Sequence, residues 1–228
     1  MRHLIILHGA IGASVQLLPL AEALGDTYKV HTPDFSGHGN SPLPDAPFSI
    51  PLFAADVLRY MEQHQLDKVS VLGYSMGGYA GMYLAIHHPG KIDRLIALGT
   101  KYEWSEAIAA KEIQMMDPGK IALKLPAFAA TLAERHAVNG WKTVLARTTE
   151  LMTAMGNDNP IKQEDYARVA IPVLLLLGDR DKMSGLEETA AVYRLLPDAQ
   201  MGMLPGTPHP IEQVDIPMLS FMVKRFLK

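Results

Sequence analysis

The segment Gly73-Tyr74-Ser75-Met76-Gly77 constrains the fold more than any other part of this sequence. It directly follows the apolar run 69–72 and precedes a helical pattern, so it predicts a strand, a tight turn and a helix. Such a turn strains the backbone of its central residue and needs small neighbours two positions away on either side. Gly73 and Gly77 meet that need. The pattern therefore presents Ser75 on a sharp turn, which indicates a reactive serine.

Short apolar runs alternate with helical patterns along most of the chain. The runs at 4–7, 69–72 and 173–177 are apolar at nearly every position, which is typical of strands buried on both faces. The sequence therefore predicts the α/β class, with a mostly parallel, doubly wound sheet between two helix layers. The predicted strands are 4–7, 28–32, 69–72, 94–98, 173–177 and 201–204, and the predicted helices are 15–24, 51–64, 76–87, 185–196 and 211–227.

Residues 101–170 break this alternation, because they carry helical patterns and no convincing strand. We expect them to form a helical insertion, the cap, between the two parts of a sheet domain at 1–100 and 171–228. Most apolar residues of the cap should pack against one another and the sheet domain, and a subset should form an apolar lid over a small-molecule site. These residues are Trp104, Ile108, Met115, Met116, Ile121, Leu123, Phe128, Leu132, Trp141, Leu145, Leu151, Met152 and Met155.

Composition excludes several other classes of protein. A chain of 228 residues with 48% hydrophobic and 20% charged residues is typical of one globular domain, and a net charge of −3 without basic runs argues against nucleic acid as a partner. The absence of cysteine excludes disulfides, thiolate metal sites and a cysteine nucleophile. No segment reaches the roughly 18 consecutive apolar residues of a membrane span, and the first apolar stretch stops at His8-Gly9. A cytoplasmic location is the default expectation.

A serine hydroxyl needs a base within hydrogen-bond reach and usually a carboxylate behind that base. Asp179 and Asp181 both follow the strand predicted at 173–177, at the sheet edge where open α/β sheets build their sites. His209 follows the last predicted strand on a turn between Gly206 and Pro210, so its ring can project over the same edge. These residues are candidates for the acid and the base.

Other histidines compete with His209 for this role, and position separates them. His8 and His38 each neighbour a glycine in a strand-end loop, and we expect His8 to shape its loop by hydrogen bonds rather than to act as a base. Asp179 and Arg180 should stabilise the loop of the acid. The histidines expected at the surface or as helix caps are His64, His87, His88 and His136.

Taken together and in this order, the motifs resemble those of the α/β-hydrolase superfamily nearly from end to end. They are His8-Gly9-Ala10, the loop 34–41, the segment 73–78, and Gly178-Asp179-Arg180-Asp181 with Gly206-Thr207-Pro208-His209. The resemblance implies that Asp181 rather than Asp179 is the acid, that His209 is the base, and that the backbone N–H groups of Ala10 and Met76 form an oxyanion hole. Family members usually place a β-hairpin ahead of the His-Gly strand, and that strand begins here almost at Met1, so we expect about six strands.

The same resemblance implies a carboxylesterase-like serine hydrolase that cleaves a small to medium, apolar ester or thioester, with neither a metal nor an organic cofactor. Ser at position 75 argues against the dehalogenase and epoxide hydrolase branches, which use Asp there. Two alternatives remain: a C–C bond hydrolase or lyase similar to the menaquinone-pathway synthases, and a non-catalytic ligand receptor. The cap has no basic cluster suited to a polyanionic substrate. The sequence sets neither the acyl length nor the oligomeric state.

Overall fold

The computed structural model describes residues 1–228 and contains a single six-stranded sheet in the order β2-β1-β3-β4-β5-β6. Every neighbouring pair of strands is parallel, as expected for strands joined by helical crossovers. The predicted fold class is confirmed. The strands are β1 (His3–Leu7), β2 (Lys29–His31), β3 (Val69–Tyr74), β4 (Ile92–Leu98), β5 (Val173–Gly178) and β6 (Ala199–Leu204).

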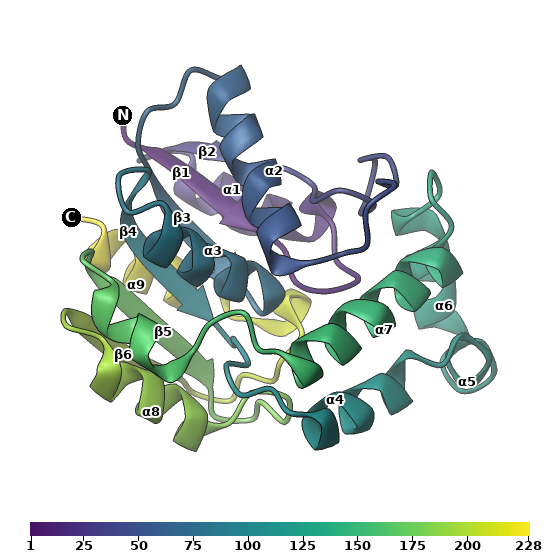
Figure 1. Ribbon diagram of the computed structural model, residues 1–228. Coiled ribbons are helices and arrows are strands. Elements are labelled where there is room, and N and C mark those ends of the chain that lie inside the picture. The colour runs from purple at the N-terminus through teal and green to yellow at the C-terminus, as the bar shows by residue number, and fades with distance from the viewer.

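Helices cover both faces of the sheet (Figure 1). In the sheet domain these are α1 (Leu18–Leu24), α2 (Ile50–Gln63), α3 (Met76–His87), α8 (Leu186–Leu195) and α9 (Ile216–Phe226), with the 3-10 helices η1 (Ser14–Leu17) and η4 (Ile211–Gln213). In the cap they are α4 (Glu106–Ile113), η2 (Gln114–Met116), α5 (Pro118–Lys124), α6 (Pro126–Arg135), α7 (Trp141–Asn157) and η3 (Gln163–Arg168).

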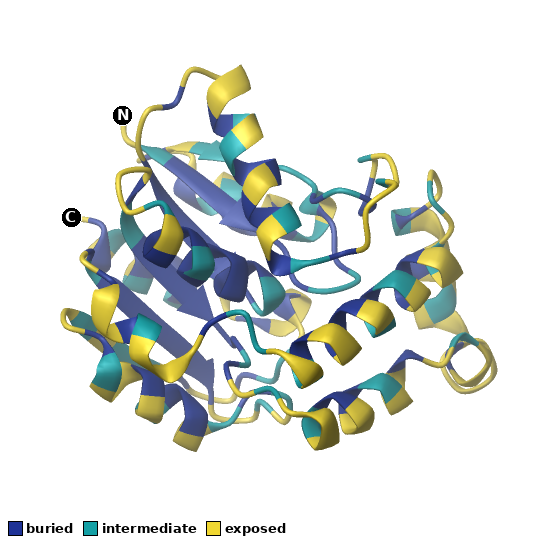
Figure 2. Cartoon of the chain, viewed as in Figure 1, coloured by how far each residue is buried: buried dark blue, intermediate teal, exposed yellow.

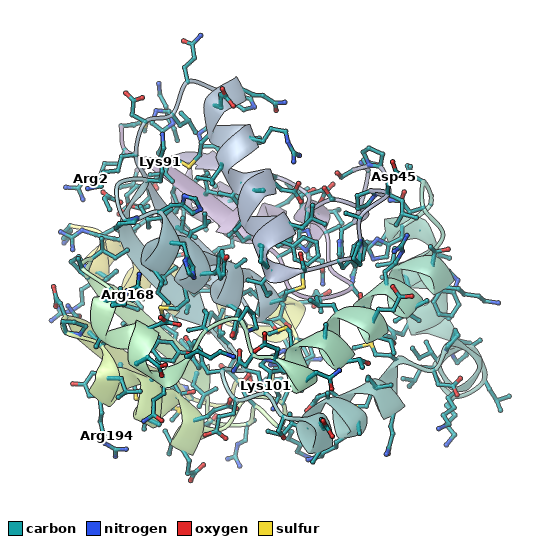
Figure 3. The ribbon with its side chains drawn as sticks, viewed as in Figure 1. Arg2, Asp45, Lys91, Lys101, Arg168 and Arg194 are labelled. Atoms are coloured by element: carbon teal, nitrogen blue, oxygen red, sulfur yellow. The ribbon has the colours of Figure 1, made fainter.

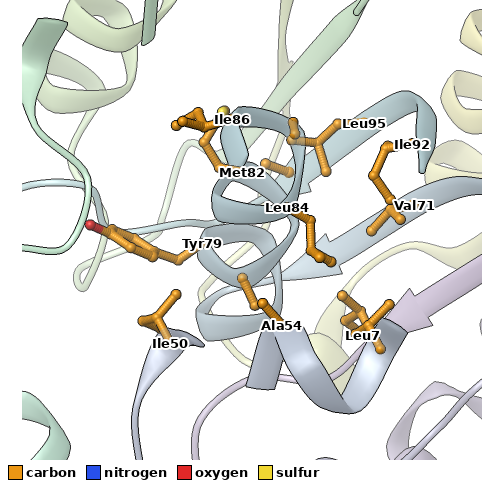
Figure 4. Close-up of a cluster of buried hydrophobic side chains, with 14 of the residues drawn as sticks. Leu7, Ile50, Ala54, Val71, Tyr79, Met82, Leu84, Ile86, Ile92 and Leu95 are labelled. Carbon is orange, nitrogen blue, oxygen red and sulfur yellow. The ribbon is translucent and has the colours of Figure 1, made fainter. Parts of the chain in front are cut away.

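Strand side chains alternate between two apolar layers. In β1, Ile5 and Leu7 belong to the layer under α2, α3 and α8, whereas Leu4 and Ile6 belong to the layer under α1 and α9. This alternation follows from the two-residue repeat of a strand, and it explains why β1, β3 and β5 are apolar throughout. Figure 4 shows the first layer, where Leu7 lies near helices α2 and α3, and Figure 2 shows the strands buried between helices with exposed outer faces.

The predicted helix at 211–227 is divided in the structure. It begins as the short η4, and α9 starts only at Ile216. The side chain of Asp215 accepts a hydrogen bond from the backbone N–H of Met218, and Pro217 lies in the first turn of α9. Both residues are favoured at a helix N-terminus, so they end one helix and begin the next.

The cap helices lie together beside the sheet domain (Figure 1). Met116, Ile121, Leu132, Leu145 and Met152 form a small apolar cluster inside the cap. None of the helices combines the length and the apolar character needed to cross a lipid bilayer.

Candidate active site

Ser75 occupies the turn between β3 and α3, and its φ of 53° lies in the left-handed region that non-glycine residues rarely adopt. The glycines two positions away are required by close backbone contacts. A Cβ atom at Gly73 would collide with the backbone of Gly77, and one at Gly77 would collide with the backbone of Leu7 and His8. The local sequence therefore fixes the turn, and the turn presents the serine hydroxyl at the N-terminus of α3.

The loops after β5 and β6 bring Asp181 and His209 to Ser75. Nε2 of His209 lies 3.2 Å from Oγ of Ser75, and Nδ1 of His209 lies 2.7 Å from Oδ2 of Asp181. Asp179 does not take part in this series of hydrogen bonds. Its Oδ1 accepts a hydrogen bond from the backbone N–H of Thr207, and Arg180 lies 3.7 Å away from its other oxygen. Asp179 thus links the loop of Asp181 to the loop of His209, as expected.

Backbone donors hold the Asp181 carboxylate in place. Its Oδ1 accepts hydrogen bonds from the N–H groups of Met183 and Ser184, while Oδ2 accepts from His209. Burial by itself would raise the pKa of Asp181, but the bond from His209 and the two backbone donors outweigh burial and hold the pKa below its ordinary value. Asp181 is therefore suited to stay ionised beside an imidazole.

The loop after β1 carries the expected oxyanion donor Ala10. Ala10, Met76 and Ser75 line one cavity, and Met76 is the first residue of α3, where a backbone N–H has no acceptor within the helix. His8 shapes this loop as predicted: its Nδ1 lies 2.8 Å from the carbonyl of Gly9, and its Nε2 accepts from the backbone N–H of Phe35. Burial lowers the pKa of His8 to about 4, so its ring is neutral at pH 7.

His136 corrects the expectation of a surface histidine. It is the C-cap residue of α6, as a capping role requires, but its side chain is fully buried between the cap and the sheet domain. Its Nε2 lies 2.9 Å from the carbonyl oxygen of Ile11, and its Nδ1 accepts from the backbone N–H of Gly39. Sequence spacing gave no signal for this contact, because it depends on how the cap docks.

The cavity above Ser75 and His209 has a volume of about 220 Å³. Six of the cap's apolar residues line it, while Ile121, Leu132 and Leu145 pack inside the cap instead. Some apolar residues of the cap thus face the cavity and others the cap interior, while their role as a lid stays a prediction. The six are Trp104, Met116, Phe128, Leu151, Met152 and Met155.

The sequence pattern does not predict the charged residues of this cavity. Lys101 lies where the chain leaves β4 for the cap (Figure 3), with its Nζ 3.5 Å from Glu112 and 3.9 Å from Glu188. Arg135 and Glu212 form an ion pair of 3.2 Å at the other side. Sequence periodicity does not reveal which charged residues face a ligand. No group of three or more His, Cys, Asp or Glu side chains is arranged to hold a metal ion.

The sheet is parallel and doubly wound. A serine lies on a strained turn after one strand, and an acid and a histidine lie on loops after two others. This arrangement is typical of α/β proteins with a nucleophile elbow. A family model described as the alpha/beta hydrolase fold matches residues 2–131, more than half of the chain. The chain belongs to this family.

Individual relatives are more distant. The chain is 28% identical over 178 residues to 3-oxoadipate enol-lactonase 2 of Acinetobacter baylyi, an alignment that covers 70% of this chain and 64% of that protein. It is 33% identical over 95 residues to esterase YbfF of Escherichia coli, covering 42% of this chain and 37% of the esterase. The chain thus spans less than two thirds of the length of these relatives.

Among solved structures, the chain is similar to a thermophilic esterase from Thermogutta terrifontis. The TM-score is 0.81 at 20% identity, and the match covers 100% of this chain and 89% of that one. A likeness at this level of identity shows the fold.

Proposed function

We propose that this chain is a serine hydrolase that cleaves a small to medium, apolar carboxylic ester or thioester. The observation that carries the proposal is the series of hydrogen bonds from Asp181 through His209 to Ser75. Ser75 and His209 both line an apolar cavity. If these residues formed only a structural hydrogen-bond network, the strained φ of a serine beside a cavity would have no explanation.

In the proposed first step, Nε2 of His209 takes the hydroxyl proton of Ser75 while Oγ attacks the substrate carbonyl. The carbonyl π electrons move to oxygen, and the N–H groups of Ala10 and Met76 bind the resulting oxyanion, each contributing about 3 kcal/mol. The tetrahedral species then collapses, the C–O or C–S bond breaks, and His209 returns its proton to the leaving alcohol or thiol. An acyl group remains on Ser75.

The second step repeats this sequence with water. His209 takes a proton from water, the hydroxide oxygen attacks the acyl carbon, and the acid leaves as Oγ of Ser75 regains its proton. Asp181 supports both steps, because its bond to Nδ1 keeps the proton on that nitrogen and leaves Nε2 as the acceptor. Its negative charge also stabilises the imidazolium that forms in each step.

The relatives agree with this chemistry at the level of the bond that is broken. One is called an enol-lactonase and the other an esterase, and both names denote cleavage of an ester linkage. The cavity lining, with Trp104, Phe128 and several methionines, favours an apolar acyl chain or alcohol over a highly charged substrate.

The test is hydrolysis of p-nitrophenyl esters from acetate to decanoate by the wild-type chain and by Ser75→Ala. We expect turnover that depends on Ser75 and an optimum chain length set by the cavity. Thermal melting of both proteins controls for folding. If the folded wild type cleaves no ester, or if Ser75→Ala keeps full activity, the proposal is wrong, and a C–C hydrolase, a lyase or a ligand receptor becomes the better account.

A further inference from the structure

The end of cap helix α6 contacts the loop that carries the expected oxyanion donor Ala10. The carbonyl oxygen of Ile11, the next residue, accepts hydrogen bonds from Nε2 of His136 at 2.9 Å and from Nη1 of Arg135 at 3.3 Å. Two cap side chains thus converge on a single backbone carbonyl in the loop of Ala10.

Ala10 and Ile11 are the two central residues of a tight turn. The backbone N–H of Gly12 donates to the carbonyl of Gly9 at 3.1 Å, which closes the turn. Ile11 has a φ of 51°, a conformation that is strongly disfavoured for a β-branched side chain. A residue stays in such a conformation only when its surroundings hold it there. The two bonds to the Ile11 carbonyl are therefore restraints on the turn.

His136 itself is held on several sides. Its Nδ1 accepts from the N–H of Gly39 at 3.1 Å, so the proton of the neutral ring must be on Nε2, which donates to Ile11. Its ring packs edge-on against that of His38, with 5.8 Å between centroids. Burial also lowers the pKa of His136, which favours this neutral form.

Arg135 extends the same connection to the loop of the base. Its Nη2 lies 3.2 Å from Oε1 of Glu212, three residues after His209, and its side chain is only 7% exposed. The last residues of α6 therefore contact both the turn of Ala10 and the segment that follows His209.

We infer that His136, assisted by Arg135, is a positioning residue that holds the Ala10 N–H in the orientation that binds the developing oxyanion. This inference rests on the proposed function and extends it, because it gives the cap a part in the chemical step besides covering the substrate. Without these bonds, Ile11 would relax toward negative φ, and the peptide groups of the turn would rotate with it.

Two variants of His136 test the inference. His136→Phe keeps a ring but removes the bonds of this side chain to Ile11 and Gly39, whereas His136→Gln keeps a donor and an acceptor. For His136→Phe we expect kcat on the best p-nitrophenyl ester to fall about tenfold, a part of the loss seen when an oxyanion donor is removed, with KM changed less than about twofold. The affinity for a boronic acid that mimics the tetrahedral intermediate should fall in parallel. His136→Gln should recover part of both.

The control is Asn139→Ala. Nδ2 of Asn139 donates to the carbonyl of Ser41 at 2.7 Å, so this variant removes another bond between cap and sheet domain away from the Ala10 turn. It should leave kcat and boronic acid affinity near those of the wild type. Equal losses in Asn139→Ala and His136→Phe would mean that general docking of the cap matters, and the inference would be wrong.

A readout without turnover separates this inference from the proposed function. The amide resonance of Ala10 in nitrogen-15 labelled protein should shift in His136→Phe and stay in place in Asn139→Ala. If the wild type cleaves no ester, the proposed function fails, but the resonance still tests the positioning. An unchanged Ala10 resonance in a folded His136→Phe protein, or unchanged kcat and boronic acid affinity, would overturn it.

Discussion

The sheet domain and the cap bury very different amounts of apolar surface. The layers on the two faces of the sheet contain 33 and 19 buried residues, and seven of the 33 belong to the cap, whereas the cap's own cluster contains 5. The cap also leaves Leu123 and Leu125 largely exposed, at 81% and 55%. Since burial of apolar surface is the main favourable term in folding, the cap depends on its contacts with the sheet domain for its order.

The two regions also contribute different parts of the site. Ser75 and Asp181 follow β3 and β5, which are buried at every position, and His209 follows the edge strand β6, which pairs with β5. Their mutual distances are therefore set by the backbone of the sheet. The cap supplies six of the 13 hydrophobic residues that line the cavity, and its own apolar cluster is small. Reaction chemistry should therefore respond most to changes in the sheet domain, and substrate choice to changes in the cap.

The largest expected effect lies in the sheet domain. Asp181→Asn should lower kcat by about 10⁴-fold, because an amide can hold His209 in the wrong tautomer and cannot stabilise its charged form. Asp179→Asn is the matched control, since Asp179 contacts Thr207 and Arg180 rather than His209. It should keep at least about a tenth of the activity. Steady-state kinetics on one ester compares kcat of the two variants, and the reverse ranking would show that the acid is Asp179.

The second effect concerns the stability of the sheet domain. The pKa of His8 is lowered from 6.5 to about 4 by burial, so between these values the unfolded chain binds more protons than the folded one. The free energy of unfolding should thus be highest above pH 6.5 and fall as the pH drops toward 4, by about 3 kcal/mol from this residue. Urea unfolding at several pH values measures the slope.

His8→Gln should flatten that slope, and His87→Gln is its control, because His87 is exposed on the outer turn of α3. If the two variants show the same pH dependence of unfolding as the wild type, the His8 ring does not account for the acid sensitivity.

The third effect is on substrate choice by the cap. Glu112 lines the cavity, is 5% exposed and shares Lys101 with Glu188, so two carboxylates lie beside the Lys101 ammonium. Glu112→Gln should raise kcat/KM for esters whose acyl chain ends in a carboxylate by about fivefold relative to methyl-terminated esters. Glu106→Gln, at an exposed position on the same helix, should leave this ratio unchanged. A ratio that stays constant in both variants would remove Glu112 from the account of selectivity.

The smallest effect is a change in acyl length. Met152 lines the cavity and packs in the cap cluster, so Met152→Ala should lengthen the preferred acyl chain by about one or two carbons, with kcat changed only about twofold. Met115 is 51% exposed and Met115→Ala serves as control. An ester series from butanoate to dodecanoate measures the shift. A large loss of kcat on every ester would instead mean that the cap cannot be altered without disturbing the sheet domain.

The same division explains what the sequence could predict. The central strands are apolar throughout and the turns carry glycine, so local pattern is enough to find the six strands and to place Ser75, both Asp179 and Asp181, and His209 at one sheet edge. The choice of Asp181 over Asp179 needs the resemblance to the family. The break before α9 also has a local signal, Asp215 followed by Pro217, although apolar periodicity alone predicts one helix at 211–227. The contacts of His136 and Glu112 had none, because both arise only when the cap docks on the sheet domain.

The central claim, that Ser75 is the nucleophile of a serine hydrolase, is tested most directly by covalent labelling with a p-nitrophenyl phosphonate followed by intact-mass and peptide mass spectrometry. We expect one phosphonyl group per chain, attached to Ser75, with labelling abolished in Ser75→Ala and strongly slowed in His209→Ala. Absence of labelling in the folded wild-type protein, or a label on any residue other than Ser75, would contradict the account.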